Sequence, residues 1–359
     1  MKELAQTGLQ SAFIVCDSLK IRLHGFAQMF KFIRIWRRDQ MHSALTRKII
    51  LTRSLWMAAI FLARPACILS AQTMEDTAAV DLLADTRIAF VSRSNLNFDI
   101  YLMNPDGSNI IRLTDNAKPG HVPGHMHPDW SPDGSRIAYT TDPERHGQFS
   151  IWIMNSDGRE QSQLTDKSRN FLSPKWSPDG TKIIFAERDH DGLFIMNLDN
   201  ARRRRITFTK DSHIAWLPDG SGFACYSANS PQGGGLYIMN LDRTIRGLLI
   251  GNAEDAISAW SPDGSKLVVN LERDSQWATY VMEADGANMI PLNNRVAEHT
   301  TLSWSPDGSK VAYVSDEDGN FEIYVMNANG GHQRRLTHNS HYDADPAWSP
   351  FLQPSVDED

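Results

Sequence analysis

The sequence predicts an all-β chain, folded as a six-bladed β-propeller of four-stranded antiparallel blades. One motif, Trp-Ser-Pro-Asp-Gly, recurs with one variant and one truncated copy, at Trp130, Trp176, Trp216, Trp260, Trp304 and Trp348. The gaps between these tryptophans are 46, 40, 44, 44 and 44 residues. A period in the forties that contains several short strands is typical of propeller blades. In addition, residues 87–350 show no helical periodicity, and the first and last repeats are incomplete in complementary ways.

Each repeat contains the same four strands in the same order. The first strand ends at the motif tryptophan. The Pro-Asp-Gly that follows predicts a tight turn, because proline presets φ, aspartate bonds the local backbone and glycine supplies positive φ. The second strands are continuous apolar runs, as expected for strands covered on both faces, at 137–139, 183–185, 267–269 and 311–313. The third strands end in Met-Asn, at 101–104, 152–155, 237–240 and 324–327. The fourth strands end in Arg-Leu-Thr or a close variant, at 112–114, 163–165, 205–207 and 335–337.

The two ends of the repeat region predict how the ring closes. The first repeat opens at Arg87 with no tryptophan strand before it. The last copy ends near Pro350, with no second, third or fourth strand after it. We therefore expect the C-terminal strand to supply the missing inner strand of the first blade, so that the N- and C-terminal segments pair and close the ring.

The N-terminal region is interpreted as a targeting segment. Residues 41–71 combine basic residues, a short apolar core over 55–63 and small residues before Gln72, which are the three parts of a secretory signal peptide. An apolar run of nine residues is too short to span a bilayer, which requires about 20, so no stable membrane span is expected after cleavage. We interpret 1–40 as an over-extended start, 72–86 as a linker, 87–350 as the propeller and 351–359 as an acidic tail. The expected location is periplasmic or secreted.

Charge and cysteine content exclude several classes of protein. Residues 1–71 carry eleven Lys and Arg against three Asp and Glu, a net charge of +8, so the total of −7 leaves −15 on residues 72–359. A chain this acidic is a poor partner for nucleic acid, because phosphate contacts require clustered Lys and Arg. The basic run 202–205 is an exception, and we interpret it as a solvated turn. Cys225 is the one cysteine in the repeats, so they form no disulfide of their own.

These motifs resemble a known family. The Trp-Ser-Pro-Asp-Gly turn, third strands such as Ile-Tyr-Val-Met-Asn at 323–327 and the Arg-Leu-Thr ending are similar to the TolB-like, WD-repeat-related propeller repeat, over about residues 87–350. The resemblance implies a ring that binds something, often a protein. TolB is a periplasmic component of the Tol–Pal envelope system and carries an α/β domain ahead of its propeller. Residues 72–86 are too short for such a domain, so we expect a TolB-like propeller without it.

The candidate binding residues lie around the position five residues before each motif tryptophan. Equivalent positions on the inner strands should form a ring at the mouth of the central channel, near the loops of variable length where binding usually occurs. Their carboxylates and imidazoles could hold a cationic group or a divalent metal. The same side chains could instead bond neighbouring backbone and tie the blades together, and this alternative stays open. The candidates are His125, His127, Asp211, Asp255, His299 and Asp343.

A tighter histidine cluster, His121, His125 and His127, is the candidate for a metal site. Propeller mouths are wide, however, so groups on a ring need not reach the contacts of roughly 2 Å that a metal requires. The repeats contain no Gly-x-Ser-x-Gly nucleophile elbow, and Gly233–Gly235 precedes a strand, whereas a phosphate loop precedes a helix.

The sequence therefore predicts a non-enzymatic, exported binding propeller with no catalytic residues and no required cofactor. Its expected partner is a protein of the cell envelope or a small polar ligand, bound on the face with variable loops. The alternative is a metal-dependent lyase or hydrolase acting on an acidic saccharide. Some propellers similar to this one are oligogalacturonate lyases that use a histidine-bound metal.

Overall fold

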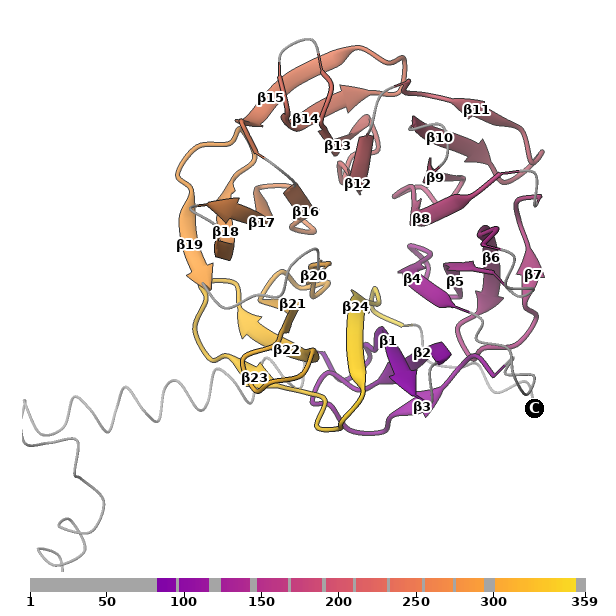
Figure 1. The fold of residues 1–359 in the computed structure, drawn as a ribbon, viewed down its shortest axis with the longest axis vertical. Helices are drawn as coiled ribbons and strands as arrows, with labels where there is room; N and C mark the ends of the chain where they lie inside the picture. Colours follow the sequence, from indigo (N-terminus) through magenta and orange to yellow (C-terminus); the bar gives the residue numbers. More distant parts are fainter. Residues whose placement is uncertain are drawn as a thin grey trace, which may run out of the picture. The chain divides into compact units, whose positions relative to one another are not determined.

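The computed structural model describes residues 83–352, except for gaps at 95–96, 116–123, 143–146, 167–168, 189–191, 209–210, 231–232, 254–255, 274–275 and 294–300. In this part of the chain 24 strands form six four-stranded antiparallel sheets, which surround a common centre (Figure 1). The predicted six-bladed propeller is confirmed. The expected over-extended start and signal peptide lie outside the described residues, as do His121, Asp255 and His299.

Each blade contributes one strand to each of four concentric positions, and we number the blades 1 to 6 from the one that contains β1. The inner strands are β24 (Tyr342–Trp348), β4 (His125–Trp130), β8 (Phe171–Trp176), β12 (Asp211–Trp216), β16 (Ala256–Trp260) and β20 (Ser303–Trp304). The second strands are β1 (Ile88–Ser94), β5 (Arg136–Thr141), β9 (Lys182–Glu187), β13 (Gly222–Ser227), β17 (Lys266–Arg273) and β21 (Lys310–Ser315). The third strands are β2 (Asn97–Met103), β6 (Ser150–Asn155), β10 (Gly192–Asn197), β14 (Gly235–Asn240), β18 (Gln276–Glu283) and β22 (Glu322–Asn327). The outer strands are β3 (Ile111–Arg112), β7 (Ser162–Gln163), β11 (Arg203–Arg205), β15 (Ile245–Gly251), β19 (Ile290–Asn293) and β23 (Arg334–Arg335).

The ring closes through blade 1, as the incomplete repeats predict. Its strand order is β24-β1-β2-β3, so the last strand of the chain is the inner strand of the first blade. The pairing is antiparallel and includes Ile88 with Trp348. The backbone N–H of Arg87 also donates to Ser349 Oγ at 2.8 Å. The N- and C-terminal ends of the repeat region therefore hold each other in place.

The Pro-Asp-Gly turns are held by a repeated set of hydrogen bonds. In blade 2, Ser131 Oγ donates to Asp133 Oδ1 at 2.5 Å, and the backbone N–H of Ser135 donates to the same oxygen at 3.0 Å. Gly134 closes the turn with a φ of 72°, in the left-handed region that glycine enters without steric cost. Equivalent bonds to the turn aspartate recur at Asp179, Asp263 and Asp307. The motif therefore specifies a turn.

The hydrophobic core consists of six clusters, each formed by two consecutive blades. A motif tryptophan belongs to each cluster, so these residues pack between blades. Trp130 is typical: it is 7% exposed, and its indole N–H donates to Ala347 O of blade 1 at 3.1 Å. The indole nitrogens of Trp176 and Trp260 have no acceptor among the described residues, and Trp260 differs from the other motif tryptophans because it is only half-buried.

The Arg-Leu-Thr ending fixes the outer strand to the third strand. In four blades the threonine hydroxyl accepts a backbone N–H from the third strand at 2.8–3.0 Å, with the pairs Thr114 and Ile100, Thr165 and Ile151, Thr207 and Leu193, and Thr337 and Ile323. These threonines are 0–4% exposed. A ladder of two or three residues supplies few backbone hydrogen bonds. The buried threonine therefore adds an anchor for each of these short outer strands.

Candidate functional site

The described residues five positions before the tryptophans lie at or beside the starts of the inner strands, and their side chains are buried. His125 is 1% exposed, Asp211 6% and Asp343 0%. Phe171 occupies the same position in blade 3 and packs against Phe185, with ring centroids 4.9 Å apart. These side chains lie within the blades. Their arrangement as a ligand-binding ring at the mouth of the channel stays a prediction.

His125 is a neutral imidazole in an apolar setting. Its ring packs edge-on against Tyr139, with centroids 5.8 Å apart. Neither ring nitrogen has a hydrogen-bond partner among the described residues. Burial, assisted by the charge of Arg112, lowers the pKa of His125 from 6.5 to about 4. The side chain therefore carries no charge at neutral pH.

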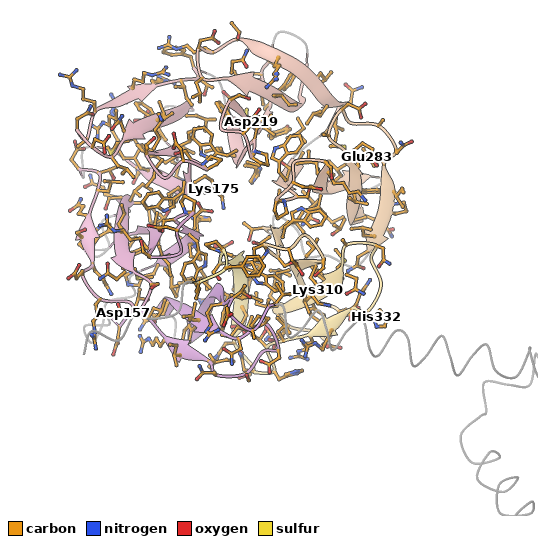
Figure 2. The ribbon with its side chains drawn as sticks, turned by 180° about the vertical axis from the view of Figure 1, so that it is seen from behind. Asp157, Lys175, Asp219, Glu283, Lys310 and His332 are labelled. Atoms are coloured by element: carbon orange, nitrogen blue, oxygen red, sulfur yellow. The ribbon has the colours of Figure 1, made fainter. Side chains whose placement is uncertain are left out.

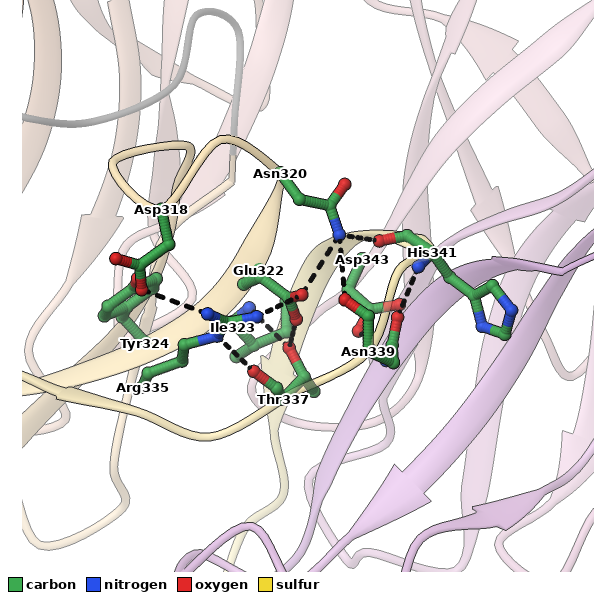
Figure 3. A network of polar contacts seen from close by, with 10 residues as sticks. All are labelled: Asp318, Asn320, Glu322, Ile323, Tyr324, Arg335, Thr337, Asn339, His341 and Asp343. Carbon is green, nitrogen blue, oxygen red and sulfur yellow. Dashed lines mark hydrogen bonds and ion pairs between the residues drawn. The ribbon is translucent and has the colours of Figure 1, made fainter.

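Asp343 belongs to a polar network that joins blade 6 to blade 1 (Figure 3). Asn339 Nδ2 donates to Asp343 Oδ2 at 2.7 Å, and Asn320 donates both to Glu322 and to the backbone carbonyl of His341. Arg335 pairs with Glu322 at 2.6 Å. Burial is the largest cause of the raised pKa of Asp343. This network ties the two blades that close the ring.

A β-bulge interrupts the inner strands of four blades. Three positions before the tryptophan, the inner strands of blades 1 to 4 adopt left-handed φ angles of 51–53°, at Asp345, His127, Ser173 and His213. The pairing register shifts at the same point in all four blades. In blades 1, 2 and 3 the next residue is proline, which lacks the N–H of a regular ladder and favours a bulge.

We call His127, Asp129, Lys175, His213 and Asp345 the central cluster. His127 donates its backbone N–H to Asp345 Oδ2 at 3.1 Å, and its ring Nε2 lies 4.0 Å from the same oxygen. Lys175 pairs with Asp129 at 2.9 Å. Figure 2 shows Lys175 beside the opening at the centre of the ring. The side chains of His127, Asp129, Lys175 and Asp345 are 17–33% exposed, so a ligand can reach them.

The electrostatics of the cluster keep His127 neutral. Burial lowers the pKa of His127, Asp345 opposes this shift, and the charges of Lys175 and His213 reinforce it. These four residues come from the inner strands of blades 1 to 4, so three other blades act on the imidazole of His127. A neutral imidazole offers both a donor and an acceptor. Together with an ammonium and two carboxylates, it can bind polar peptide groups.

The described residues contain no group of three His, Cys, Asp or Glu side chains that could hold a metal ion. They also contain no helix long and apolar enough to cross a membrane. Of the predicted site residues that the structure describes, only His127 joins the central cluster; sequence reasoning missed Asp129, Lys175, His213 and Asp345 as members. The proline two residues before Trp130, Trp176 and Trp348 was the available signal, because it indicates a bulge at the residue before it.

Comparison with known proteins now decides the family. The family model described as the TolB beta propeller domain matches residues 80–246 and 224–353. The chain belongs to the TolB β-propeller family. A curated relative, the Tol-Pal system protein TolB of Blochmanniella pennsylvanica (strain BPEN), is 35% identical over 74 residues. That match covers 20% of this chain and only 15% of the relative.

Solved structures show the same fold. TolB from Acinetobacter baumannii superposes with a TM-score of 0.66 at 20% identity, covering 75% of this chain and 67% of that one. A protein assigned as TolB from Agrobacterium tumefaciens gives a TM-score of 0.56 at 17% identity, covering 70% of this chain and 89% of that one. At these identities the likeness concerns the fold.

Proposed function

We propose that this chain is an exported, non-enzymatic binding propeller, whose central cluster contacts a protein partner in the cell envelope. The observation that carries the proposal is the group formed by His127, Lys175, His213 and Asp345, which come from four inner strands and interact electrostatically at His127. Membership of the TolB family and the likeness to the Blochmanniella relative, a Tol-Pal system protein, support an envelope setting. The proposed location is the periplasm.

A peptide segment fits the cluster better than a metal does. The exposed groups alternate in sign and hydrogen-bonding role: Asp345 accepts, Lys175 donates, and the neutral imidazole of His127 can do either. A peptide presents donors and acceptors in the same alternation. The bulges also fix the backbone that carries these groups, so little conformational freedom is lost when a partner binds.

The test compares partner capture by the tagged full chain and two variants. The variant His213→Asn with Asp345→Asn changes the cluster while retaining side chains that tolerate positive φ. The matched control is Asp285→Asn, an exposed aspartate in an outer turn whose oxygen accepts the N–H of Ala287. Quantitative mass spectrometry of proteins crosslinked in the native host provides the readout.

We expect an envelope protein that is captured by the unchanged chain and by Asp285→Asn to be lost with the cluster variant. Equal capture by all three proteins would contradict the proposal. Metal analysis of the purified chain tests the enzyme alternative separately. Stoichiometric metal that disappears in His125→Ala with His127→Ala would favour the lyase or hydrolase.

A further inference from the structure

The turn between β14 and β15 departs from its counterparts in a way that bears on binding. In blades 1, 2, 5 and 6 the equivalent turn position is glycine with positive φ, at Gly107, Gly158, Gly286 and Gly330. In blade 4 this position is Arg243, with a φ of 80°. Side chains larger than those of Asn or Asp rarely adopt this conformation. Such strain at an exposed turn points to a function.

The glycines allow close contact between blades. A Cβ atom at Gly158 would lie 2.7 Å from the carbonyl oxygen of Leu113 in the preceding blade, and one at Gly107 would lie 2.7 Å from that of Leu336. Arg243 carries a Cβ, so its turn cannot approach blade 3 in the same way. Its guanidinium instead donates to the carbonyl of Arg205 at 3.1 Å.

A cavity of about 180 Å³ lies at this junction between blades 3 and 4. Its walls include Ile206 and Phe208 after β11, and Tyr237, Arg243 and Ile245 of blade 4. Sites for cofactors and drug-sized ligands measure about 300–1,000 Å³. A cavity this small suits a single bulky side chain. Asp211, one of the predicted binding residues, also borders it.

The rim of the cavity combines exposed apolar groups with arginines. Phe208 is 62% exposed, and the guanidinium carbons of Arg205 and Arg243 lie 4.7 and 5.1 Å from the centre of its ring. Ile245 and Leu248 on β15 are 37% and 43% exposed. Contiguous exposed apolar groups on a rim mark an interaction surface.

Arg204 and Arg243 bond backbone carbonyls rather than carboxylates. Arg204 donates to the carbonyl of Leu241 at 2.9 Å, and Arg243 to that of Arg205. Among the described residues no carboxylate forms a salt bridge with either of them. An incoming carboxylate can therefore form the bidentate pair that arginine favours.

We propose that this rim cleft, formed by Arg204, Phe208, Arg243 and Ile245, binds an extended segment of a partner protein in which acidic residues flank a bulky apolar side chain. The apolar side chain enters the cavity beside Phe208. The flanking carboxylates pair with Arg204 and Arg243. The surface lies on the outer edge of the ring, so it is separate from the central cluster and can act whether or not that cluster binds a partner.

The test selects ligands without assuming their sequence. Random nonapeptides displayed on phage are selected on the full chain. We expect enriched peptides with an excess of Asp and Glu around one large apolar residue. A selected peptide, measured by fluorescence anisotropy, should bind Arg243→Gly and Phe208→Ala at least about tenfold more weakly, and its affinity should fall with added salt.

Two measurements separate binding from folding. Arg243→Gly should melt at the same or a higher temperature, because glycine adopts this φ without strain. Arg159→Ala removes an exposed arginine from the equivalent turn of blade 2, where it pairs only with Asp157 among the described residues, and should leave binding unchanged. Enriched peptides without acidic excess, or unchanged binding by Arg243→Gly, would overturn the proposal. Self-association of the full chain that depends on Arg243 would overturn it in favour of a second copy.

Discussion

The junction between blades 1 and 2 and the junction between blades 3 and 4 are built from the same repeat, yet one is closed and the other open. At the first, the glycine turn of blade 2 lies against Leu113, and His125 is buried beside Tyr139. At the second, Arg243 replaces the glycine, and Asp211, equivalent to His125, borders a cavity. One turn residue thus separates a sealed interface from one that can admit a side chain.

The motif tryptophans of the two junctions do not share this difference. Near the centre both junctions contain a motif tryptophan whose indole N–H donates to a carbonyl of the preceding blade: Trp130 to Ala347 at 3.1 Å and Trp216 to Lys175 at 3.0 Å. A repeat protein can therefore change its surface at one blade without changing its core. The predictions below test this division, from the largest expected effect to the smallest.

The largest effect should come from removing residues 345–359. This deletion removes Trp348 and most of β24, and so opens the interfaces of blade 1 with blades 6 and 2. We expect loss of the cooperative thermal transition, measured by circular dichroism at a strand wavelength. A truncated chain that melts within a few degrees of the full chain would show that ring closure contributes little to the closed junction.

Trp130→Ala and Trp216→Ala should each lower the free energy of unfolding by about 3–5 kcal/mol. Both side chains are less than a tenth exposed, at 7% and 9%, and each variant loses the indole hydrogen bond to the preceding blade. Chemical denaturation measures the two values. A difference of more than about 2 kcal/mol between them would show that the open junction is loosened down to its core.

His125→Phe should change how stability depends on pH. The pKa of His125 is lowered from 6.5 to about 4, so below pH 6.5 the unfolded chain gains a proton that the folded chain does not. Stability is therefore lost as pH falls from about 6.5 to about 4, by up to about 3 kcal/mol for a shift of this size.

Phenylalanine removes this loss, and blade 3 already carries Phe171 at the same position. We expect denaturation midpoints of the two proteins to converge near pH 7.5 and to separate, in favour of the variant, toward pH 4. If the midpoints of the two proteins instead change in parallel between pH 7.5 and pH 4, His125 is protonated in the folded chain. The closed junction would then contain a charged group.

The scaffold was predictable because its determinants are local and recur. The spacing of the tryptophans, the Pro-Asp-Gly turns and the incomplete end repeats specify strands, turns and closure within short windows of sequence. Because the repeat occurs six times, one altered copy does not obscure the pattern. An example is Trp216, where leucine replaces the serine of the motif.

The binding surfaces were harder to predict because they depend on side-chain direction and on contacts between blades. At the bulge before Trp130, His127 has a left-handed φ and a side chain that is 29% exposed, whereas His125 two residues earlier is buried. Strand alternation alone does not supply this distinction. The rim cleft depends on Arg243 meeting Phe208, 35 residues away in the chain. The basic run at 202–205 is predicted to be a solvated turn. Arg203 and Arg205 instead make specific contacts, with Asp166 and Phe208.

The smallest effect isolates the contact that seals the closed junction. Gly158→Ala introduces a Cβ both at a φ of 85° and 2.7 Å from Leu113 O, whereas Gly147→Ala introduces one at a φ of 71° with no atom within 4 Å. Positive φ alone costs alanine about 1 kcal/mol, which is the loss expected for Gly147→Ala. Gly158→Ala should cost about 2–3 kcal/mol, because the strain of the displaced turn adds to that penalty. Urea denaturation of the two variants measures the difference. Equal losses would mean that the turn moves away from blade 1 at no cost, and the glycine would then not be what keeps this junction closed.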